Sequence, residues 1–149
     1  MIRTERRWRI CTALLIANLI FIWGNSLLPG EISGAFSDWV KEIVARLFPG
    51  DGEAAPGGGL LRKIAHFTEF AALGMLLTWR MGMLQKHPGF ALCLGASAAC
   101  VDETIQRFVP DRGPSIRDVG IDTCGVITGM MLLLVGHYLL KRKNGGKQA

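Results

Sequence analysis

Two stretches decide the fold: ICTALLIANLIFIWGNSLL, residues 10–28, and VGIDTCGVITGMMLLLVGHYLL, residues 119–140. The first contains no charged side chain, and the second contains one acid, Asp122. The hydrocarbon core of a membrane needs roughly 20 mostly apolar residues for each helical crossing. Both stretches therefore predict transmembrane helices.

Two weaker stretches between them predict two further crossings. Residues 64–84 carry only His66, Glu69 and Arg80 as ionisable groups. Residues 88–101 are uncharged but short, so their helix must continue into residues 102–109. Half of the chain is hydrophobic and only 19% is charged, and apolar residues gathered in long blocks are untypical of a soluble domain. The predicted fold class is an all-α, polytopic membrane bundle of four transmembrane helices with one amphipathic interfacial helix.

The segment before the first crossing is basic, as in a secretory signal. The apolar run is longer than the usual signal core, and its end lacks a clear small-x-small cleavage site. We therefore expect residues 1–28 to be a basic tail followed by an uncleaved membrane anchor. The basic residues of this tail are Arg3, Arg6, Arg7 and Arg9.

Charge predicts the orientation, because Lys and Arg are retained on the cytoplasmic side of short loops. With both termini inside, four crossings leave ten of the 17 basic residues in the cytoplasm but only Glu5 of the 12 acids. We expect a multi-pass protein of the cell membrane with both termini cytoplasmic. The basic residues are split between tails and loops and form no single stripe, so a nucleic-acid partner is not expected.

The outer connector, residues 29–59, has its own organisation. Apolar residues recur at helical spacing between Phe36 and Phe48, with Ser33 or Ser37 available as caps and Gly50 as a stop. They predict an amphipathic helix at the outer interface or over the end of the bundle. Residues 50–59 are a Gly-rich linker by composition. Residues 60–140 then form the core, and residues 141–149 a basic cytoplasmic tail.

Polar residues gather in three groups that this topology brings to the outer side. Within each of the first two groups, the spacing places the side chains on one helix face. Gly125 and Gly129 continue the stripe of the two aspartates in the third group, and small residues let helices approach closely within one chain or in a homodimer. The groups are Lys63, His66 and Glu69; Asp102, Glu103 and Gln106; and Arg112, Ser115, Asp118 and Asp122.

Ionised groups in a membrane are costly unless they are paired or hydrated, which makes these groups a candidate site. Lys63, Arg112 and Arg107 would hold an anionic headgroup, with the carboxylates and the amide ordering its polar part. An intramembrane enzyme using His66 or Glu103 as general acid or base is the alternative. A purely structural polar network is the second alternative, and Ser115 with Asp118 also fits a helix capping box.

Metal and cofactor sites are not predicted from the sequence. One His with scattered carboxylates is weak metal spacing. The chain has no Gly-rich phosphate loop, no Gly-x-Ser-x-Gly elbow and no HExxH motif. No conventional catalytic motif is therefore present, and no cofactor is expected.

Two motifs resemble the VanZ-like membrane proteins: KIAHFTEF at residues 63–70 and DETIQRFVPDRGPSIRD at residues 102–118. The resemblance covers residues 60–140, with Asp111 where that family often has Gly and Asp122 where it often has Asn. It implies a bacterial cell-envelope role, such as low-level resistance to teicoplanin and related lipoglycopeptides or a housekeeping envelope function. It also implies, as partners beside the lipid bilayer, a lipid-linked cell-wall precursor or a lipoglycopeptide.

Overall fold

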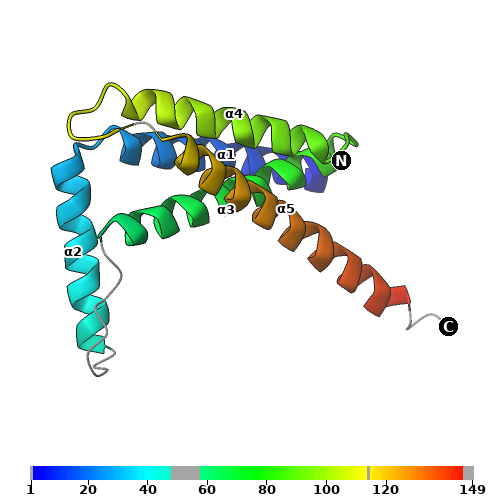
Figure 1. Ribbon diagram of the computed structural model, residues 1–149. Coiled ribbons are helices and arrows are strands. Elements are labelled where there is room, and N and C mark those ends of the chain that lie inside the picture. Colours follow the sequence, from blue (N-terminus) through cyan, green and yellow to red (C-terminus); the bar gives the residue numbers. More distant parts are fainter. Residues whose placement is uncertain (1, 48–57, 114, 146–149) are drawn as a thin grey trace.

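The computed structural model describes residues 2–47, 58–113 and 115–145, and this part of the chain is all-α. Its regular elements are five helices (Figure 1). They are α1 (Ile2–Ser26), α2 (Gly30–Leu47), α3 (Gly58–Met83), α4 (Gly89–Gln106) and α5 (Ile116–Gly145). Every predicted helix is present, and the all-α fold class is confirmed.

Four of the helices, α1, α3, α4 and α5, alternate in direction, so their ends meet in two groups (Figure 1). At one end the guanidinium of Arg80, late in α3, lies 3.8 Å from the ring centroid of Trp8, early in α1. At the other end the Gly30 N–H donates to the carbonyl of Pro110 at 3.3 Å. The end of α1, the start of α3, the end of α4 and the start of α5 therefore share one end of the bundle.

Helix α3 lies at the centre, and small residues bring α5 against it. A Cβ added at Gly125 would lie 2.5 Å from the carbonyl oxygen of Phe67, and one added at Gly129 would overlap the carbonyl of Ala71. Both glycines therefore serve packing within the chain. The homodimer stays a prediction, and a second copy would have to meet other residues than these two.

The outside of the bundle is apolar. Large hydrophobic side chains are exposed along its helices, for example Ile20 in α1 and Leu132 in α5, which are 67% and 59% exposed. Hydroxyl groups on exposed faces bond to the carbonyl four residues earlier, as Thr128 does to Cys124 at 2.8 Å. The hydroxyl groups on this surface therefore have hydrogen-bond partners without water, which suits contact with lipid.

Length and composition identify two of the described helices as able to cross a membrane, over Thr4–Ser26 and Ile116–Asn144. These are the two stretches from which the fold was predicted. Helices α3 and α4 form as predicted but do not meet the same criterion. The count of four crossings therefore stays a prediction.

Helix α2 lies across the end of the bundle (Figure 1). It begins at Gly30, directly after Pro29, so the prediction that Ser33 or Ser37 caps it was wrong. Proline lacks a backbone N–H, and the beginning of a helix tolerates that absence. Helix α2 therefore begins directly after Pro29, closer to α1 than predicted. Phe48, Gly50 and most of the predicted linker lie outside the described residues, as do residues 146–149 of the basic tail.

Candidate functional site

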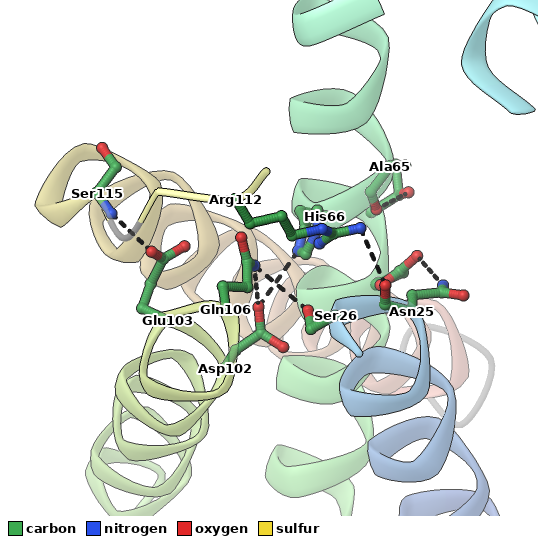
Figure 2. A network of polar contacts seen from close by, with 11 residues as sticks. Asn25, Ser26, Ala65, His66, Asp102, Glu103, Gln106, Arg112 and Ser115 are labelled. Carbon is green, nitrogen blue, oxygen red and sulfur yellow. Dashed lines mark hydrogen bonds and ion pairs between the residues drawn. The ribbon is translucent and has the colours of Figure 1, made fainter. Parts of the chain in front are cut away.

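The three predicted polar groups meet at the end of the bundle where α1 and α4 end and α3 and α5 begin (Figure 2). Four of their side chains are almost completely enclosed by neighbouring helices. We call the residues of all three groups, together with Asn25, Ser26 and Arg62, the polar cluster. The enclosed side chains are Asp102, Glu103, Gln106 and Asp122, which are 0%, 6%, 4% and 1% exposed.

Asp102 lies at the centre of the polar cluster. The Gln106 amide, one turn later on α4, donates to Asp102 Oδ2 at 2.8 Å and to Ser26 Oγ on α1 at 3.3 Å. His66 Nδ1 on α3 lies 3.7 Å from the same carboxylate oxygen. Asp102 thus connects α3 with α4, and through Gln106 also with α1 (Figure 2).

Asn25 connects the end of α1 to two other parts of the cluster. Its side-chain nitrogen Nδ2 donates to Glu69 Oε1 on α3 at 3.0 Å, and its backbone carbonyl accepts from Arg112 Nη2 at 3.1 Å. Sequence reasoning missed Asn25 and Ser26, because they follow an apolar run and resemble an ordinary helix end. Two adjacent polar residues closing a membrane helix were the available signal.

The start of α5 is held by two contacts. The backbone N–H of Ser115 donates to Glu103 Oε2 at 2.7 Å, and Lys63 Nζ lies 3.5 Å from Asp118 Oδ1, an ion pair without hydrogen-bond geometry. Ser115 immediately precedes α5, as the predicted capping box requires. The Asp118 side chain also joins α5 to α3, so it does more than start its own helix.

Cations surround the opening of the polar cluster. Arg62 and Lys63 line a small pocket together with His66, Glu103 and Asp122. Arg112 reaches across His66 toward Asn25 (Figure 2). The structure places Arg107 on the exposed surface, outside the residues that line this pocket. Arg62, and not Arg107, is thus the additional arginine that lines the pocket. Its position directly before Lys63 was the available signal in the sequence.

Arg112 lies in the loop between α4 and α5 and is half-buried. Burial lowers the pKa of its guanidinium from the ordinary value, and the positive charge of Arg62 lowers it further, while Asp102 and Glu103 oppose both effects. An arginine nevertheless stays protonated at neutral pH. The cluster therefore holds a fixed positive charge at Arg112.

Several buried polar atoms of the cluster have no hydrogen-bond partner within the described residues. Such atoms are rare in folded proteins, because each one loses its hydration without compensation. Both signs of charge are represented, so the site offers donors as well as acceptors to a ligand. The atoms are Glu69 Oε2, Asp102 Oδ1, Glu103 Oε1, both carboxylate oxygens of Asp122, and Arg112 Nε and Nη1.

An apolar groove of about 270 Å³ lies beside the polar cluster, between α1, α3 and α4. Trp23 lines it two residues before Asn25, and Val101 lines it directly before Asp102. The rest of the lining is Leu19, Leu73, Leu77, Leu94, Ser97 and Ala98. A ligand with a charged head and an apolar tail would meet suitable surfaces in both places.

A comparison with protein families finds that the model described as VanZ/LLP1 matches residues 8–139. The match includes most of α1 as well as the two motifs, and so begins well before the predicted core of residues 60–140. No curated protein and no solved structure matches the chain.

Proposed function

The chain belongs to the VanZ/LLP1 family of membrane proteins, and on that premise we propose that its polar cluster binds an anionic ligand at the outer face of the cell membrane. The ligand is the headgroup of a lipid-linked envelope precursor, or a glycopeptide. Its capture would support low-level glycopeptide resistance or envelope homeostasis. The proposal places both termini in the cytoplasm, as the distribution of Lys and Arg favours.

The state of Arg112 is the observation that carries this proposal. One nitrogen of its guanidinium is fixed to the carbonyl of Asn25, while Nε and Nη1 are buried without a partner. A guanidinium presents its N–H groups as a planar fork that matches a carboxylate or a phosphate. Nε and Nη1 each share an edge of the guanidinium with Nη2, so an anion at either edge would give one of the two buried nitrogens its missing partner.

The apolar groove supports a ligand that carries a lipid. Its lining begins next to Asn25 and Asp102 and continues toward the middle of the bundle through Leu19 and Leu94. A lipid held by its headgroup at Arg112 could place an acyl or prenyl chain there. The groove is apolar enough to favour such a chain over water.

Native mass spectrometry of the protein in nanodiscs containing anionic envelope lipids tests the proposal. We expect a defined anionic lipid to stay bound to the wild-type protein and to be lost from Arg112→Ala. A charge-assisted bond of this kind contributes about 1.5–3 kcal/mol, equivalent to a loss of affinity of roughly tenfold to a hundredfold. Arg107→Ala is the matched control, because it removes an exposed arginine, whereas Arg112 is half-buried.

Equal retention of the lipid by wild type and Arg112→Ala would contradict the proposal. Loss of the lipid from both arginine variants would point to general charge attraction rather than to a site. A bare wild-type protein would favour the structural reading, in which contacts such as Gln106 to Ser26 serve only to join helices.

An intramembrane enzyme acting on the same class of lipid is the second candidate. His66 lies 3.7 Å from Asp102 and lines the pocket, an arrangement in which a carboxylate could orient an imidazole as general acid or base. Turnover of a labelled envelope lipid by the purified protein, lost in His66→Ala, would favour this candidate. Binding without turnover would favour the first.

A further inference from the structure

We propose that His66, Asp102 and Asp122 form a binding site for a divalent transition-metal cation at the base of the polar cluster. The three residues come from three different helices, α3, α4 and α5. Each offers one donor atom, and these atoms lie within 4.8 Å of one another. This site is additional to the anion site at Arg112.

Unpartnered oxygens point to a missing ligand at this place. Asp122 is 1% exposed and neither of its carboxylate oxygens has a hydrogen-bond partner, and Asp102, fully buried, has one oxygen in the same state. Buried carboxylates are normally paired, hydrogen-bonded or bound to a metal. A cation between Asp102 and Asp122 would satisfy oxygens that no described protein group satisfies.

The cluster holds more acidic than basic side chains. Five carboxylates gather there, and three basic side chains accompany them. The carboxylates therefore outnumber the basic side chains by two, and a divalent cation is a partner that the remaining carboxylates could share. The carboxylates are Glu69, Asp102, Glu103, Asp118 and Asp122, and the basic side chains are Arg62, Lys63 and Arg112.

Size and geometry also suit a single ion. The pocket that His66 and Asp122 line has a volume of about 10 Å³, roughly the space that one water-sized particle needs. A tetrahedral zinc ion with bonds of about 2.0–2.2 Å separates its ligand atoms by roughly 3.3–3.6 Å. The donor atoms of His66, Asp102 and Asp122 lie within 4.8 Å of one another, so the three side chains would draw closer together around a bound zinc ion.

The surroundings support the ligands as a metal site requires. The Gln106 amide holds Asp102 Oδ2 at 2.8 Å, and second-shell hydrogen bonds of this kind orient ligands and tune their affinity. One imidazole nitrogen with two carboxylates suits Zn²⁺, Mn²⁺ or Fe²⁺ better than Ca²⁺ or a soft copper ion. The absence of a metal prediction from sequence reflects the distances along the chain, because the three donors are brought together only by packing.

Metal loading of the purified protein in nanodiscs tests this site. After treatment with a chelator, the protein is titrated with Zn²⁺ or Mn²⁺ and examined by native mass spectrometry, with Co²⁺ absorption as a probe of the ligands. We expect one ion per wild-type chain and at least about tenfold weaker binding in Asp122→Asn. Asp111→Asn is the matched control: it makes the same change at an exposed aspartate outside the pocket.

The inference would be overturned if the wild-type protein bound none of Zn²⁺, Mn²⁺ and Co²⁺. Equal binding by the wild-type protein and Asp122→Asn would overturn it as well. If Asp122→Asn does not fold, His66→Gln replaces it with the same expected loss. The same spectra also resolve bound lipid. Lipid without metal would refute this site and leave the anion site intact, while metal without lipid would do the reverse.

Discussion

Asp111 is one of two described non-glycine residues with a positive φ, and Gln85 is the other. The φ of Asp111 is 59°, in the left-handed region that favours glycine, and Gly30 packs against its carbonyl. A glycine would adopt this conformation without strain. Aspartate is among the residues that tolerate the region best, because its short side chain can bond locally.

Substitution of Asp111 tests this reading of the loop. Asp111→Val should lower the free energy of unfolding by about 1–2 kcal/mol relative to Asp111→Gly, because a β-branched residue strongly disfavours positive φ. Thermal unfolding in detergent measures the difference. Equal midpoints for the two variants would show that the turn does not hold this conformation.

The candidate residues named from the sequence were mostly those that the structure brings together. Apolar spans fix which side of a helix faces lipid, so ionisable residues such as His66 and Asp102 could be expected to point inward. Partners could not be predicted in the same way. The bond between Asn25 and Glu69 joins α1 to α3, and no local pattern determines which residues of two separate helices will lie at the same depth.

At the scale of single helices, the close contact between α3 and α5 depends on glycines of α5, which have no Cβ. Gly129→Ala should lower the free energy of unfolding by about 1–3 kcal/mol, since its Cβ would overlap the backbone of Ala71. Gly136→Ala is the control on the same helix, because its Cβ would meet no atom within 4 Å. Circular dichroism during heating in detergent measures both, and equal stability of the two variants would contradict the packing.

Helix boundaries show where sequence reasoning reached its limit. The long apolar stretches predicted α1 and α5 because their length alone identifies a crossing. Helix α2 was predicted from its apolar spacing, yet a cap at Ser33 or Ser37 placed its start at least four residues too late. The contact of Gly30 with Pro110, which fixes that start, joins residues that are far apart in the sequence.

At the scale of the whole molecule, the bundle separates two kinds of charged surface. The end formed by Trp8 and Arg80 has basic residues around it, whereas the described acids other than Glu5 lie toward the end that holds the polar cluster. Lys and Arg favour the cytoplasm, so this separation agrees with the proposed orientation. A ligand outside the cell would then meet the opening at Arg112 directly.

The sidedness of the polar cluster is the central claim, and cysteine labelling in intact cells tests it most directly. In a variant without the four native cysteines, Gly113→Cys places a thiol beside the cluster, and Lys86→Cys places one in the exposed turn at the other end. We expect a membrane-impermeant maleimide to label position 113 in intact cells and position 86 only after the cells are opened. The reverse pattern, or labelling of both positions from the outside, would contradict the account.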